Sequence, residues 1–124
     1  MESSGKQYIG ALDQGTTSTR FILFDKQGKE AGSRQLEHKQ YYPRPGWVEH
    51  DPMEIWEKSC RVIEETLSSV GISGNDVAAL GITNQRETTV VWDKNSGRPF
   101  CNAVVWQDTR TSGVISRLAE EGGT

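Results

Sequence analysis

The segment of residues 8–25 constrains the fold most strongly, because it joins two short apolar runs through a polar loop. The runs at residues 8–13 and 21–25 are bounded by turn residues and are rich in residue types that favour strands. They predict a hairpin of two largely buried strands. The loop between them contains a glycine that can take a positive φ, followed by a series of hydroxyl side chains.

The side chains of this loop match the needs of a bound phosphate and its metal ion. Thr16, Thr17 and Ser18 supply hydroxyl donors on a tight turn, and Arg20 adds positive charge. Asp13, at the rim, suits Mg²⁺ held directly or through water. The alternative is an ordinary hairpin turn in which Asp13 and the threonines bond only the local backbone. The loop differs from a P-loop, since no Walker A sequence occurs in the chain.

Composition and charge limit the classes of partner. The chain has 124 residues, the length of one ordinary domain, and a formal net charge of -3. Charges of both signs are interspersed, so there is no basic stripe for nucleic acid and no polybasic patch for a membrane surface. No apolar run has the length of a membrane span, and residues 1–6 predict a disordered polar tail without the apolar core of a secretory signal. We therefore expect a cytosolic protein with small-molecule partners.

The isolated cysteines and histidines show no spacing typical of metal ligands. Cys60 and Cys101 lie in unrelated contexts, so we expect buried or surface thiols rather than a disulfide or a metal site. For His38 and His50 we expect surface or capping positions.

The pattern after the hairpin predicts a third strand, a helix and further extended segments. Residues 30–40 form a polar strand suited to a sheet edge. Asp51 before Pro52 marks the start of a helix that continues to about residue 70 and ends at Gly71. The later elements are a strand at 88–93, a turn at 94–97, an extended run at 102–106 and a helix at 111–121.

Residues 77–83 have the small, apolar character of a strand buried on both faces, as in a sheet covered by helices. A helix followed by such a strand predicts a parallel crossover unit. Residues 84–87 come directly after this strand, at the carboxyl edge where ligands bind in open α/β sheets.

A second group of candidate residues is suited to a small neutral polyol. Arg86 beside Glu87 can donate to and accept from a hydroxyl, and the indole of Trp106 can cover the carbon skeleton. The alternative is a surface ion pair with Trp106 as a core aromatic, and spacing alone favours that alternative.

Four segments together resemble a known family: ALDQGTTSTR (11–20), PGWVEHDP (45–52), GITNQRETT (81–89) and NAVVW (102–106). They resemble the amino-terminal part of glycerol kinases, which are FGGY carbohydrate kinases, over about residues 7–121. The first two segments are similar to the wider family, whereas NQRETT (84–89) points to glycerol kinases in particular. The resemblance implies an α/β, actin-like (ribonuclease H-like) ATPase fold, with a mixed sheet that starts with an antiparallel three-stranded meander and is flanked by helices.

The resemblance also implies a reaction and residue roles. Glycerol kinases transfer the γ-phosphoryl group of ATP to glycerol, with Mg²⁺, giving sn-glycerol 3-phosphate. By this resemblance the phosphates of ATP would be bound by Thr16, Thr17, Ser18 and Arg20, with Asp13 supporting Mg²⁺. The glycerol would be bound by Arg86, Glu87 and Trp106.

The chain departs from the resembled family in length. Glycerol kinases are several times longer, and by resemblance they form homo-oligomers and have a second domain that closes over the nucleotide. Residues 7–124 are therefore expected to form part of the first domain only. The general base lies beyond this segment in the family, so no residue here is assigned that role, Asp108 included. We expect these 124 residues to be inactive alone.

Three other functions stay open from the sequence. One is a non-catalytic fragment or pseudo-enzyme that binds phosphate or a partner, and another is a kinase of a related polyol or sugar. The third is an actin- or chaperone-like nucleotide switch, against which Arg86, Glu87 and Trp106 argue.

Overall fold

The structure is a computed structural model that describes residues 6–122 and divides into two compact units. We call residues 1–39 and 53–85 the sheet unit, and residues 40–52 and 86–124 the turn unit. Apart from Lys6, the tail predicted at residues 1–6 lies outside the described residues. Within residues 6–122 no helix is long and apolar enough to span a bilayer.

The sheet unit is built on the predicted hairpin. Strands β1 (Tyr8–Gln14), β2 (Ser18–Phe24) and β3 (Glu30–Glu37) form an antiparallel meander, and β5 (Val77–Thr83) pairs with β1 in parallel. The strand order is β3-β2-β1-β5, with the polar β3 at one edge as predicted. The mixed sheet thus has the three-stranded start expected from the sequence.

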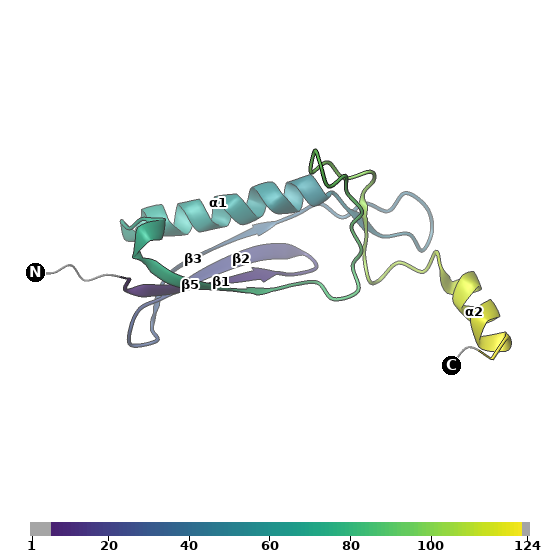
Figure 1. Cartoon of the computed structure of the whole chain (residues 1–124), viewed down its shortest axis with the longest axis horizontal. Helices are drawn as coiled ribbons and strands as arrows, with labels where there is room; N and C mark the ends of the chain where they lie inside the picture. The colour runs from purple at the N-terminus through teal and green to yellow at the C-terminus, as the bar shows by residue number, and fades with distance from the viewer. Residues whose placement is uncertain (1–5, 123–124) are drawn as a thin grey trace, which may run out of the picture. The chain divides into compact units, whose positions relative to one another are not determined.

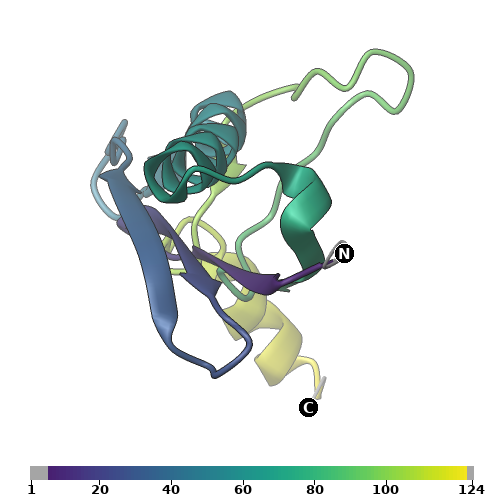
Figure 2. The same ribbon diagram turned by 90° about the vertical axis from the view of Figure 1, so that its left-hand side faces the viewer.

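Helix α1 (Pro52–Val70) covers one face of this sheet, as Figures 1 and 2 show. Its inward side buries Val62 and Thr66 against the sheet, which matches the period of apolar residues along the helix. The helix ends as predicted, where the amides of Gly71 and Ile72 both donate to the carbonyl of Leu67. The buried core of the unit consists of Leu12, Phe21, Leu23 and Val62.

The prediction that the strand at 77–83 is buried on both faces is wrong. β5 forms as expected and pairs in parallel with β1, but residues 78–83 are exposed, Leu80 at 47% and Ile82 at 67%. The reason is that β5 is the last strand of the sheet described here, and α1 covers only one sheet face. The small apolar residues of β5 therefore predict its parallel pairing correctly, but they do not predict its burial.

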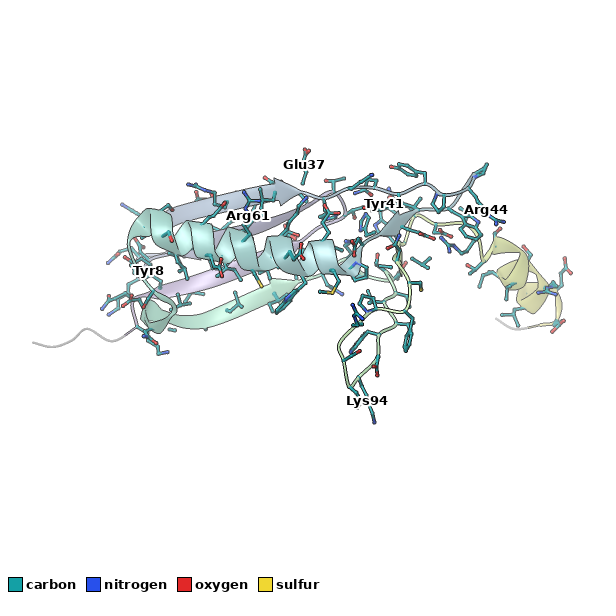
Figure 3. The ribbon with its side chains drawn as sticks, turned by 90° about the horizontal axis from the view of Figure 1, so that it is seen from above. Tyr8, Glu37, Tyr41, Arg44, Arg61 and Lys94 are labelled. Atoms are coloured by element: carbon teal, nitrogen blue, oxygen red, sulfur yellow. The ribbon has the colours of Figure 1, made fainter. Side chains whose placement is uncertain are left out.

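The turn unit contains little regular sheet. Strand β4 (Glu49–His50) pairs with β6 (Ala103–Val104), and α2 (Ser112–Glu120) follows as predicted. The strand predicted at 88–93 is wrong, because only isolated bridges form there, between Thr89 and Val104 and between Trp92 and Pro99. These bridges still make a hairpin, whose predicted turn at 94–97 carries Lys94 at its tip (Figure 3).

The cysteines are free, Cys60 half-buried in α1 and Cys101 exposed, as expected for isolated thiols. The expectation of surface positions for the histidines is wrong. His50 is fully buried in the turn unit, with its Nε2 2.6 Å from Oε1 of Gln40. His38 is 6% exposed and lies behind the candidate phosphate loop.

Candidate functional site

The candidate phosphate loop is a two-residue hairpin connection at the end of β1. The amide of Gly15 donates to the carbonyl of Ser18 at 2.9 Å, which leaves Thr16 and Thr17 at the tip. Gly15 does not use the positive φ that the sequence allowed. Instead, a Cβ at Gly15 would lie 3.1 Å from the Ser18 carbonyl oxygen, which is tighter than an ordinary van der Waals contact, so glycine favours the close approach of the two strands.

The polar side chains of the loop are accessible from solvent. Asp13, Thr17 and Arg20 are exposed, and Thr16 and Ser18 are half-buried. Asp13 and Arg20 are paired across β1 and β2, which places their side chains on the same face of the sheet beside the turn. The hairpin thus presents hydroxyls, a carboxylate and a guanidinium at one end of the sheet unit.

Two buried polar side chains, His38 and Gln85, and the half-buried Gln14 hold this loop from behind. The Gly15 carbonyl accepts from Nε2 of Gln14 at 3.0 Å and lies 3.2 Å from Nε2 of His38. Gln85 donates to Oε1 of Gln14 at 3.0 Å, and the amide of His38 donates to the carbonyl of Thr17 at 3.1 Å. Burial lowers the pKa of His38, which favours a neutral imidazole that donates its Nε2–H to Gly15.

The sequence interpretation missed the three residues of this supporting network. Gln14, His38 and Gln85 come from β1, from the segment after β3 and from the segment after β5. Gln14 ends β1, and Gln85 follows the end of its parallel neighbour β5. These positions at one edge of the sheet are the only sequence signal that the two side chains meet.

One carboxylate beside the candidate phosphate loop, that of Asp13 at the end of β1, is suited to a metal ion. Among residues 6–122 no group of three or more His, Cys, Asp or Glu side chains could hold a metal by itself. Mg²⁺ usually keeps several waters and takes one or two carboxylates together with phosphate oxygens. The exposed Asp13 beside the phosphate loop fits that donor set, because the missing ligands would come from water and a nucleotide.

The candidate polyol residues lie in the turn unit. Arg86 and Glu87 occupy an exposed turn, and Trp106 is 52% exposed rather than a core aromatic. Among the described residues, Glu87 alone has a positive φ, 68°, without being glycine. Such a backbone costs about 1–3 kcal/mol, and strained residues of this kind cluster at functional sites.

The structure joins the chain segments that carry these three residues. The amide of Trp106 donates to Oγ1 of Thr88 at 3.3 Å, directly after Glu87. Thr89 and Val104 exchange two backbone hydrogen bonds of 3.0 Å each. The segments that bear Glu87 and Trp106 therefore run side by side, as a shared polyol site requires.

Asp108 is held by other groups and is not a free base. Its carboxylate accepts from the backbone amide of Val48 at 2.7 Å and from the guanidinium of Arg110 at 2.7–2.9 Å. Arg110 lowers its pKa to about 2, so the group is ionised and already bonded at neutral pH. This geometry gives Asp108 a structural role in the turn unit.

A family model for the N-terminal domain of the FGGY family of carbohydrate kinases matches residues 8–124. The chain belongs to this family. The FGGY match covers both the candidate phosphate loop and the segments of Arg86, Glu87 and Trp106.

Individual FGGY kinases are similar over nearly the whole chain. The glycerol kinase of Leifsonia xyli subsp. xyli is 60% identical over 117 residues, which are 94% of this chain and 23% of that protein. The crystal structure of Plasmodium falciparum glycerol kinase with ADP matches with a TM-score of 0.87 and 33% identity, over 97% of this chain and 24% of that one. The chain thus spans about a quarter of the length of these relatives.

The FGGY fold is shared by kinases of other substrates. The gluconate kinase of Lactobacillus acidophilus matches with a TM-score of 0.84 at 24% identity, covering 97% of this chain and 23% of that one, a likeness of fold alone. These likenesses confirm the expected actin-like α/β fold, of which this chain holds a part.

Proposed function

We propose that this chain is the phosphate- and polyol-binding part of a glycerol kinase, which phosphorylates glycerol to sn-glycerol 3-phosphate with ATP. The observation that carries the proposal is the 60% identity with the Leifsonia xyli glycerol kinase over 94% of the chain. The exposed hydroxyl loop and the accessible Trp106 support it, because both groups are open to ligands.

In this proposal the loop at residues 15–18 binds the phosphates of ATP. The hydroxyls of Thr16, Thr17 and Ser18 donate to phosphate oxygens, and Arg20 offsets their charge. The supporting network behind Gly15 keeps the loop in place before the nucleotide binds, so little reorganisation accompanies binding. Phosphoryl transfer depends mainly on such positioning and on neutralised charge.

Asp13 is proposed to hold Mg²⁺ beside these phosphates, directly or through water. The ion, when bound, would neutralise charge on the transferred phosphoryl group. We place the reaction in the cytosol, where both ATP and Mg²⁺ are present.

Arg86 and Glu87 are proposed to bind the hydroxyls of glycerol, and Trp106 to pack on its carbons. A hydroxyl needs both a donor and an acceptor, which the guanidinium and the carboxylate supply. The left-handed backbone of Glu87 supports this role, since strained backbone conformations cluster at ligand-binding and catalytic sites.

The reaction also needs a base that takes the proton of the attacking hydroxyl, and we assign none in this chain. Asp108 is bonded to Arg110 and Val48, and the pKa of its carboxyl, about 2, is too low for a base near neutral pH. We place the base and the remaining nucleotide contacts in the part of a longer kinase that this chain does not span. The isolated 124 residues should therefore show no glycerol-dependent turnover of ATP.

The test is a chimera in which this chain replaces the matching segment of the Leifsonia xyli glycerol kinase. A coupled assay of ADP release is run with glycerol, gluconate and xylulose, and the isolated chain is measured in parallel. We expect turnover by the chimera with glycerol alone. A folded chimera without turnover would indicate that this chain is a non-catalytic segment. Faster turnover with gluconate or xylulose than with glycerol would show that glycerol is not the preferred substrate.

A further inference from the structure

Trp106 lies in a tight turn of the turn unit. The amide of Asp108 donates to the carbonyl of Val105 at 2.8 Å, so Trp106 and Gln107 form the tip of the turn. Val105 before the tip is 2% exposed, whereas Trp106 is half-exposed. The direction of the indole therefore depends on how the two ends of this turn are held.

Both ends of the turn are fixed to one residue, Val48. The amide of Val105 donates to the Val48 carbonyl at 3.0 Å, and the amide of Val48 donates to Oδ2 of Asp108 at 2.7 Å. The first bond is an ordinary backbone contact. The second depends on a side chain, so it holds only while the Asp108 carboxylate keeps its orientation.

Arg110 sets that orientation with its backbone amide, which donates to Oδ1 of Asp108 at 2.8 Å, and with its side chain. Its Nε lies 2.9 Å from each oxygen of Asp108, and its Nη2 lies 2.7 Å from Oδ2. The Asp108 side chain is 2% exposed and that of Arg110 is 21% exposed, so solvent screens this pair only weakly. A planar guanidinium satisfies both carboxylate oxygens at once, which an ammonium group cannot do.

Arg110 is itself held by the segment that contains Val48. Its Nη2 donates to Oε2 of Glu49 at 2.8 Å, and its guanidinium lies 3.8 Å from the ring centroid of Trp47. The neighbouring Arg44, labelled in Figure 3, lies 5.0 Å from the same ring. Residues on both sides of Val48 thus fix the guanidinium that orients Asp108.

We propose that Asp108 and Arg110, here called the carboxylate–guanidinium clamp, are positioning residues that aim Trp106 at the polyol. This inference rests on the proposed function and extends it, because neither residue of the clamp is proposed to touch glycerol. The clamp acts through the turn at 105–108. It therefore governs the binding of the polyol and leaves the phosphate loop, which lies in the sheet unit, unaffected.

The test uses the chimera with three single variants, Arg110→Lys, Arg110→Met and Asp108→Asn. Lysine keeps the charge but loses the fork, and asparagine keeps the shape of the acceptor but loses its charge. The matched control is Arg61→Met, which removes a guanidinium whose ion pair with Glu65 is exposed on α1. The Michaelis constants for glycerol and ATP are measured for each, with circular dichroism to show that the variant is folded.

We expect the KM for glycerol to rise about tenfold or more in the clamp variants, while the KM for ATP changes less than about twofold. Arg61→Met should change neither constant. In a Trp106→Ala background, Arg110→Lys should add less than about a twofold change in the KM for glycerol, because the clamp acts through Trp106. This non-additivity distinguishes positioning from a general loss of stability.

Three results would overturn the inference. One is an unchanged KM for glycerol in a folded clamp variant, and another is an equal rise of both Michaelis constants. The third is full additivity with Trp106→Ala.

If Arg110→Met fails to fold, Arg110→Lys and Asp108→Asn still decide the question. An unmutated chimera that is folded but inactive contradicts the proposed function, and with it the clamp, whereas an active chimera with unaffected clamp variants contradicts the clamp alone.

Discussion

The two units hold their candidate site residues by different means. In the sheet unit the phosphate loop joins two strands of a regular ladder, and α1 and the core of Leu12, Phe21, Leu23 and Val62 support those strands. In the turn unit, Glu87 and Trp106 lie on irregular turns that are fixed by isolated bridges and by the ion pairs of Arg110. Backbone pairing thus positions the candidate phosphate loop, whereas charged side chains position the candidate polyol residues.

The largest effect should come from the core that supports the phosphate loop. Leu23 is fully buried in β2, so Leu23→Ala should lower the free energy of unfolding by about 2–5 kcal/mol, through lost burial and the cavity left behind. Urea unfolding of the chain, followed by far-ultraviolet circular dichroism, measures the change. The matched control is Ile82→Ala at an exposed position of β5, for which we expect the free energy of unfolding to change by no more than about 0.5 kcal/mol. Equal losses in the two variants would contradict the assigned core.

This division also explains which features the sequence could predict. The hairpin, α1 and the parallel pairing of β5 follow from apolar period, turn residues and helix-end signals, which are local. The burial of β5 was mispredicted because composition does not say which sheet face receives a covering element.

The turn unit was harder to predict because its contacts are not periodic. Thr89 and Trp92 form isolated bridges instead of a strand, and the φ of Glu87 has no glycine to signal it. Asp108 and Arg110 appear in the sequence only as two nearby opposite charges. Their bonds to Val48 and Glu49 span about 60 residues and depend on the fold as a whole.

A smaller effect is expected from Glu87→Gly, which removes the carboxylate and relieves the backbone strain at the same position. In the chimera, Glu87→Gly should lower kcat/KM for glycerol about 10- to 100-fold, because hydrogen bonds to a charged group are lost. The same change should leave the free energy of unfolding unchanged or raise it by up to about 1 kcal/mol, because glycine adopts a φ of 68° without strain. Steady-state kinetics and urea unfolding on the same protein test both parts. A loss of stability together with activity would show that Glu87 is structural.

The supporting network of the loop predicts a dependence on pH. Burial lowers the pKa of His38 below its usual 6.5, with Glu54 acting to raise it and Lys58 to lower it. As pH falls below that value the unfolded state binds a proton that the folded state resists, so the free energy of unfolding should decrease between about pH 7 and pH 5. Asp108, with a pKa of about 2, does not titrate in this range.

The variant His38→Gln tests this dependence, because glutamine keeps an N–H donor for the Gly15 carbonyl without titrating. Thermal unfolding at both pH values should show a smaller decrease in the variant than in the parent. An unchanged decrease would mean that another group titrates in this range.

The smallest effect should come from the exposed ion pair on α1. Arg61 and Glu65 are four residues apart, and their side chains are 64% and 39% exposed, so Arg61→Met should change the free energy of unfolding by about 0.5 kcal/mol or less. Urea unfolding measures the difference, and a loss above about 1 kcal/mol would show that this exposed ion pair contributes substantially to the stability of the sheet unit.

The most direct test of the division between the units is a crossed measurement of Michaelis constants in the chimera, with Thr17→Ala in the loop and Trp106→Ala in the turn. The account predicts that Thr17→Ala raises the KM for ATP alone and that Trp106→Ala raises the KM for glycerol alone. If both variants raise the same constant, or if each raises both equally, the assignment of phosphate binding to the sheet unit and polyol binding to the turn unit is wrong.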